Sequence, residues 1–149
     1  MANYSTIAAA DTYFDDERIG DVTAWTDASD ADKTKALVHA TRLIDNLSFV
    51  GKKAVAGQAL QFPREYQSAV PEDVNRAVWE CALALLEGVD MEVELEGIHI
   101  TRESIGDGST TYDRTATPVH LQAGLPSGQA WRFINRYVKS SKSVSLHRV

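Results

Sequence analysis

The spacing of apolar residues predicts a first helix over residues 7–18. Ala10, Tyr13 and Phe14 fall on one side of this helix, and Gly20 follows it as a stop signal. The aromatic side is therefore expected to face a core.

A second helix is predicted to begin at Ser29, because Asp32 three residues later completes an approximate capping box. Apolar residues then recur at helical spacing until Gly51 ends the pattern, at Ala36, Leu37, Ala40, Leu43, Ile44 and Leu47. This is the clearest amphipathic helix of the chain.

A third helix is predicted to begin at Pro71, whose missing N–H is harmless in a first turn. Glu72 and Asp73 then lie where carboxylates favour the positive end of the helix dipole. The apolar face that follows consists of Val74, Ala77, Val78, Cys81, Ala82, Leu85, Leu86 and Val89. We expect the second and third helices to pack together as the core.

Residues 91–112 change to an alternation of period two, with a turn signal at residues 106–108. This pattern predicts a β-hairpin or an extended arm, which needs a partner surface because a lone hairpin is marginally stable. Glu92, Glu94 and Glu96 would then form a row on one side. Such a row is a solvated face or an acidic patch for a basic neighbour.

Residues 113–125 are predicted to be a loop, after which Pro126 starts a last short helix and a polar tail. In this helix arginines alternate with aromatics, a composition that serves both stacking on single-stranded bases and anchoring of protein interfaces. Arg132, Arg136 and Lys139 share one helical face. The alternative interpretation is a helix docked on its own core, with a solvated basic side.

Together these elements predict a mainly α fold. We expect a small bundle of three core helices plus a C-terminal helix, with the hairpin or extended arm attached. The 149 residues fit one core. The predicted organisation is a helical domain over residues 1–125, with the arm at about 91–112, and a C-terminal helix and basic tail over residues 126–149.

The net charge of −6 argues against a protein that coats nucleic acid over its whole surface. The charge is uneven, since residues 1–30 hold seven acids and one base, whereas residues 126–149 hold five bases and no acid. This asymmetry suits a molecule whose two ends meet different neighbours, including copies of itself. An acidic solvated face with a basic tail explains it equally well.

Motifs for catalysis or cofactor binding are not found. Cys81 lies in the apolar stripe of the third helix, where cysteine is usually a buried hydrophobe. The four histidines are scattered singly, without zinc-ligand spacing, and the glycines fit no phosphate loop. We therefore expect no enzyme, no cofactor and no metal. No apolar run reaches the 18 residues of a membrane span, so no membrane partner is expected.

The segment "ALQFPREY" at residues 59–66 joins the second and third helices. Pro63 disfavours the α region for Phe62, which predicts a rigid connector with Phe62 turned toward the core. Arg64 is expected to point outward, where it contacts an acidic neighbour or an adjacent subunit.

The ordered set of segments resembles the head-to-tail connector, or adaptor, family of tailed bacteriophages. The resemblance covers roughly residues 5–137. It is carried by Ser5 to Arg18, the Trp25 loop, "KALVHATRLIDNLSFVGKKA", "LQFPRE", "VPEDVNRAVWECALALLEG" and "ITRESIGDGSTTY".

This resemblance implies a structural protein of the virion neck, present in the host cytoplasm during assembly. It implies a homo-oligomeric, twelve-fold ring that docks on the portal and extends the DNA channel, through which double-stranded DNA passes without sequence-specific binding. The ring would also dock a downstream neck or tail-completion protein. Portal-binding candidates are then Trp131, Arg132, Phe133, Arg136, Tyr137, Lys139, Lys142 and Arg148. Candidates for contacts between subunits are Arg64, Asp15, Asp16, Glu92, Glu94 and Glu96.

The chain also resembles sequences described as primosome-type (DnaT-like) single-stranded-DNA-binding proteins. In this alternative, Trp131, Phe133 and Tyr137 stack on bases, while the cations of the same helix hold phosphates. The C-terminal helix would then be a DNA-binding element.

Overall fold

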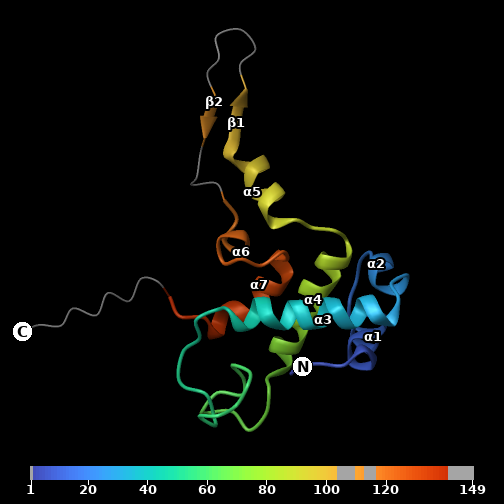
Figure 1. Ribbon diagram of the computed structural model, residues 1–149, viewed down its shortest axis with the longest axis vertical. Helices are drawn as coiled ribbons and strands as arrows, with labels where there is room; N and C mark the ends of the chain where they lie inside the picture. The colour runs from blue at the N-terminus through green and yellow to red at the C-terminus, as the bar shows by residue number, and fades with distance from the viewer. Residues whose placement is uncertain (1, 104–109, 113–116, 141–149) are drawn as a thin grey trace, which may run out of the picture.

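The computed structural model describes residues 2–103, 110–112 and 117–140. Most of this part is helical, as predicted, and Figure 1 shows a body of helices from which an arm projects. The elements are α1 (Ile7–Asp16), α2 (Thr23–Thr26), α3 (Asp30–Asp45), α4 (Glu72–Leu86), α5 (Met91–His99), β1 (Ile100–Glu103), β2 (Thr110–Tyr112), α6 (Val119–Gln122), α7 (Gly128–Ile134) and the 3₁₀ turn η1 (Asn135–Tyr137).

Helix α3 forms where the apolar stripe and the cap predicted it. Ser29 accepts a hydrogen bond from the backbone N–H of Asp32 at 3.2 Å, which satisfies one of the free donors of the first turn. Leu37, Ala40 and Ile44 are at most 1% exposed and pack against α4. The predicted pairing of these two helices is confirmed.

Helix α4 is the centre of the body, because it packs against α3, α7 and α2. Pro71 is its N-cap residue, and Glu72 and Asp73 lie in its first turn as predicted. Gly88, with φ of +80°, follows the C-cap in a conformation that favours glycine. Nine of its residues are buried, which makes α4 the most enclosed helix among the described elements.

The N-terminal segment closes one side of the core with aromatic rings. Tyr13 and Phe14 of α1 are buried, and Tyr13 packs on Trp79 with ring centroids 4.9 Å apart. The ring centroids of Trp25 of α2 and Phe14 lie 5.0 Å apart, and the indole N–H of Trp25 donates to Asp11 at 2.8 Å. The predicted aromatic side of the first helix is therefore its core face.

The arm differs from its sequence prediction in its first half. Residues 91–99 form helix α5, so the predicted row of Glu92, Glu94 and Glu96 along a strand is wrong. On a helix, Glu92 and Glu96 share a side whereas Glu94 does not. Strands β1 and β2 pair antiparallel, with a register irregularity, and the turn predicted between them lies outside the described residues.

The C-terminal helix predicted to follow residue 125 is α7, which packs against α4 rather than standing apart. Ala130 and Ile134 are fully buried on its inner side. The short helices α2 and α6 occur where the sequence predicted loops. In the described part of the chain, no helix is long and apolar enough to cross a membrane.

The loop between α3 and α4 is held by Phe62 and Arg64. Phe62 is 2% exposed, so the prediction that it turns toward the core is confirmed. The centroid of its ring lies 4.6 Å from that of Phe49 and 5.5 Å from that of Tyr137. The bond between Phe62 and Pro63 is cis.

Arg64 is only 7% exposed, so the prediction that it points outward is wrong. Its guanidinium donates to the backbone carbonyls of Phe49, Val50, Gly51 and Gln61 and to the side-chain oxygen of Gln61. A buried guanidinium has five donors to satisfy, and the curled loop provides the acceptors.

We predict that Arg64→Ala destabilises the isolated protein by about 2–4 kcal/mol, because several buried carbonyls lose their donor at once. The free energy of unfolding in urea measures this effect. Arg132→Ala is the control, since Arg132 is exposed, and it is expected to change stability by less than about 0.5 kcal/mol. Equal stability of both variants would contradict the structural role of Arg64.

Candidate functional site

The C-terminal segment presents one face to the core and another to solvent. Ser127 accepts a hydrogen bond from the backbone N–H of Ala130 at 3.1 Å and so caps α7. Burial of Ala130 and Ile134 then leaves Arg132 and Arg136 exposed. The buried face and the exposed positions of Arg132 and Arg136 agree with the spacing. The prediction that Lys139 shares their helical face is wrong, because α7 ends at Ile134 and the backbone is extended at Val138.

The three aromatic residues of this segment are only partly accessible. Trp131, Phe133 and Tyr137 are half-buried and pack against the core. Each can offer part of a ring to a ligand, but none is a free platform with both faces in solvent.

The cations of the segment differ in how far they are already paired. Arg136 forms an ion pair with Asp73 at the start of α4, with 2.5 Å between nitrogen and oxygen. Arg132 and Lys139 are exposed and form no ion pair within the described residues. Lys142 and Arg148, the other predicted contacts, lie outside the described residues.

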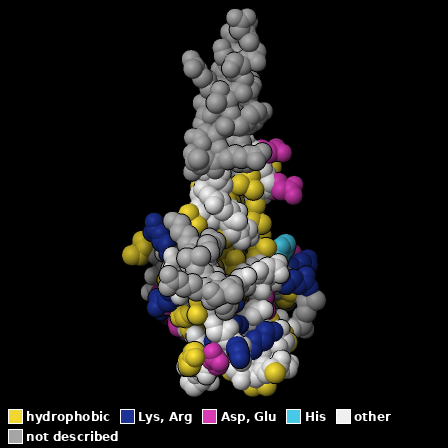
Figure 2. Space-filling view, turned by 90° about the vertical axis from the view of Figure 1, so that its left-hand side faces the viewer, with side chains coloured by type: hydrophobic (Ala, Val, Ile, Leu, Met, Phe, Trp, Pro, Cys, Tyr) yellow, Lys and Arg dark blue, Asp and Glu magenta, His cyan; other side chains and the backbone are white. Residues whose placement is uncertain are grey.

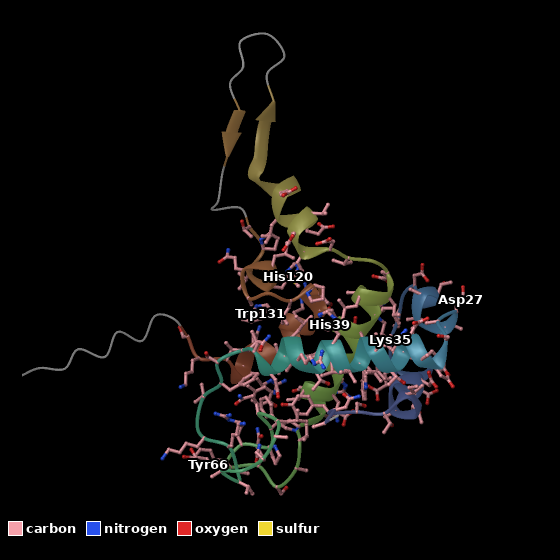
Figure 3. All side chains as sticks on the ribbon, viewed as in Figure 1. Asp27, Lys35, His39, Tyr66, His120 and Trp131 are labelled. Carbon is pink, nitrogen blue, oxygen red and sulfur yellow. The ribbon has the colours of Figure 1, made fainter. Side chains whose placement is uncertain are left out.

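A cavity of about 470 Å³ lies between α6 and α7, where Trp131 and Arg132 of the C-terminal segment meet His120. It is lined by Val119, His120, Gly128, Gln129, Trp131 and Arg132. Figure 3 shows His120 and Trp131 close together on the two helices. We call this cavity the α6/α7 pocket.

Gly128 borders the ring of His120. A Cβ at this position would lie 3.4 Å from Nδ1 of His120, at the limit of ordinary van der Waals contact. The pocket therefore combines an indole, an imidazole and a guanidinium with the exposed apolar side chain of Val119. This set suits a flat ring next to an anionic group.

A second cavity of about 470 Å³ lies on the other side of α7, where α1 and α4 meet. It is lined by Tyr13, Glu17, Arg18, Ile19, Arg76, Glu80, Gln129 and Phe133. Gln129 borders both cavities, so they are neighbours across α7.

The charges of this second cavity compensate one another. Glu80, which is 3% exposed, accepts from the Tyr13 hydroxyl at 2.8 Å and from Nε of Arg18 at 3.1 Å. Arg76 donates to Glu17 at 2.9 Å. Burial, and then the hydrogen bond to Glu80, raise the pKa of Tyr13 above its usual range, so the phenol stays neutral and donates. The network ties α1 to α4 and leaves no guanidinium free for a ligand.

The acidic residues predicted for contacts between subunits are all exposed, but they lie on separate elements. Asp15 and Asp16 end α1, whereas Glu92, Glu94 and Glu96 belong to α5. Figure 2 shows acidic side chains at the base of the arm, and Lys and Arg side chains spread over the flanks and the lower end of the body.

The described residues also include the Cys81 thiol and potential metal ligands. Burial raises the pKa of the fully buried Cys81 thiol well above its usual range, which disfavours the reactive thiolate. No group of three potential metal ligands occurs in that part of the chain.

Sequence reasoning missed His120 and Gln129 as pocket residues. A single histidine in a segment predicted to be a loop carries no signal of its own. It becomes part of a site only because α6 folds back onto the N-terminal turn of α7.

Residues 2–149 match one known protein family. The matching family is described as "Putative DnaT-like ssDNA binding protein". The chain belongs to this DnaT-like family. No curated protein and no solved structure matches it. The family corresponds to the second resemblance drawn from the sequence, and nothing in the comparisons supports the connector resemblance.

We predict that Cys81 reacts with iodoacetamide at least about 10³-fold more slowly in the native protein than in the urea-unfolded chain. The thiol is fully buried, so reaction requires an unfolding step that costs about 5–15 kcal/mol. Mass spectrometry of the alkylated protein over time measures the ratio. Rapid native labelling would show that α4 opens locally.

Proposed function

We propose that this member of the DnaT-like family binds single-stranded DNA without catalysis, and that the α6/α7 pocket receives a base and its phosphate. The observation that carries the proposal is the meeting of His120, Trp131 and Arg132 around one cavity of about 470 Å³. The family description supports the same class of ligand.

The chemistry of the pocket fits a single-stranded ligand. An unstacked base has a free π face, and stacking on an aromatic side chain contributes about 1–3 kcal/mol per base. Trp131 offers the accessible part of its indole, while Arg132 lies one residue on with its guanidinium free of carboxylates in the described structure. A base pair inside a duplex offers no such free face.

The net charge limits how much DNA such a protein holds. With a net charge of −6, contacts to many phosphates are disfavoured, so the binding we propose is short and local. For two or three phosphates, the logarithm of the affinity falls with the logarithm of the salt concentration with a slope of about −1.4 to −2.1.

We predict that a dT oligonucleotide quenches tryptophan fluorescence at low salt and that Arg132→Ala weakens its binding about tenfold, because a charge-assisted contact is lost. Fluorescence titration over a range of salt concentrations gives both the affinity and the slope.

The control is Lys35→Ala, which removes an exposed cation from α3 that is paired with Asp32 and does not line the pocket. Its affinity should equal that of the unchanged protein. If both variants bind alike, the pocket is not the binding site, and if the unchanged protein shows no quenching, the proposed function fails.

A second candidate is the head-to-tail adaptor of a bacteriophage neck, which the projecting arm favours. Helix α5 packs mainly on β1 among the described elements, and Val93 is 63% exposed. Figure 1 shows this arm clear of the helical body. An arm with little contact to its own body suits docking onto other subunits, here a homo-oligomeric ring, a portal and a downstream neck protein, around double-stranded DNA.

We predict for this candidate that the protein forms rings when mixed with a portal and that the double variant Glu92→Lys, Glu96→Lys prevents it. Both carboxylates lie on one side of α5, so reversing them removes a patch for a basic neighbour. Electron microscopy of the mixture measures ring formation, with Glu94→Lys as the control on another side of the helix. Absence of rings with the unchanged protein would reject the adaptor function.

A further inference from the structure

The loop between α3 and α4 spans residues 46–71 and contains no regular helix or strand. Loops longer than about 12–15 residues without secondary structure are uncommon in compact domains and are usually functional. Figure 1 shows this loop at the opposite end of the molecule from the arm.

The loop has a defined shape because backbone and side-chain hydrogen bonds hold it. Lys53 and Arg64 form an antiparallel bridge, and the N–H of Glu65 donates to the carbonyl of Lys52 at 2.9 Å. The side chain of Gln58 donates to the carbonyls of Leu60 and Pro63 at 2.9 Å each. A ligand that binds here therefore meets a preformed surface.

The charge inside the loop is not neutralised by a carboxylate. Within the described residues, the Arg64 guanidinium donates to uncharged carbonyl and amide oxygens and forms no ion pair. Lys52 is exposed on the same segment, and Lys53 is partly exposed. Glu65 is the acidic residue of this surface, so its net charge is positive.

Tyr66 lies on this surface, and its side chain is 88% exposed. Its ring edge lies 3.9 Å from the position of a Cβ on Gly51, and the carboxylate of Glu65 lies 3.3 Å from the same position. Figure 3 shows Tyr66 at the outer end of the loop, directed away from the body. An exposed aromatic ring beside lysines is the arrangement that single-strand-binding surfaces use.

The C-terminal segment connects this surface to the α6/α7 pocket. Phe49 and Val138 form an antiparallel bridge, and the N–H of Lys139 donates to the carbonyl of Ser48 at 2.8 Å. The exposed Lys139 thus lies beside the loop, eight residues after Trp131 of the pocket. The backbone after α7 therefore runs from the pocket to the loop.

We propose that Tyr66, with Lys52 and Lys139, forms a second contact for single-stranded DNA, in which a base stacks on the phenol ring and the lysines hold phosphates. This inference rests on the proposed single-stranded-DNA function and extends it to a site on the α3–α4 loop. A protein partner is the competing occupant, because tyrosine also anchors interfaces. The uncompensated positive charge, in a chain with a net charge of −6, favours the nucleic acid.

The test uses Tyr66→Ala and Tyr66→Trp in the full chain, with a fluorescent dT oligonucleotide of about 12 nucleotides. Tyr66→Ala is expected to weaken binding about fivefold or more, because one stacked base is lost. Tyr66→Trp is expected to bind at least as tightly as the unchanged protein and to show additional quenching from the new indole. Because Tyr66 is exposed, both variants should keep the thermal unfolding midpoint.

Ile19→Ala is the matched control, since Ile19 is also an exposed apolar side chain, 97% exposed, but follows α1. It should bind the oligonucleotide as the unchanged protein does. If Tyr66→Ala also binds unchanged while Arg132→Ala is impaired, the Tyr66 contact is wrong and the proposed function stands.

Two other outcomes would contradict the Tyr66 contact. If the unchanged protein binds no oligonucleotide, the proposed function fails, and the Tyr66 contact fails with it. If Tyr66→Ala alters sedimentation of the protein but not its affinity for the oligonucleotide, the surface docks a protein and the inference is overturned.

Discussion

The buried guanidinium of Arg64 is the interaction on which the arrangement of the loop and the C-terminal segment depends. By holding the carbonyls of Phe49, Val50 and Gly51, it sets the course of the chain after α3. That course places Phe62 against Tyr137 and lets residues 48–50 bond with residues 137–139. The surface around Tyr66 and the position of residues 137–139 therefore depend on one buried side chain.

The body distributes its charges in two different ways. Between α1 and α4, Glu80 and Glu17 pair with Arg18 and Arg76, so this region stabilises the fold and offers little to an anion. Around the α3–α4 loop, most cations lack such partners in the described structure. A protein with a net charge of −6 can thus keep a local positive surface.

The sequence predicted the helices well, because their signals are local. The cap at Ser29, the carboxylates after Pro71 and the apolar stripes each act within a few residues. Residues 91–99 were misassigned, because alternation over so few residues also occurs in helices. The direction of Arg64 was also mispredicted, because three of the carbonyls that accept its hydrogen bonds lie 13 to 15 residues earlier in the chain.

For the functional site, the sequence by itself determined the alternation of aromatics and arginines over residues 131–137 and which face of α7 is buried. Only the tertiary structure decided that Arg136 is paired with Asp73, that His120 joins Trp131, and that Tyr66 stands exposed. The physical reason is that helical spacing is a property of neighbouring residues. Ion pairing, pockets and exposure depend on which distant segments pack together.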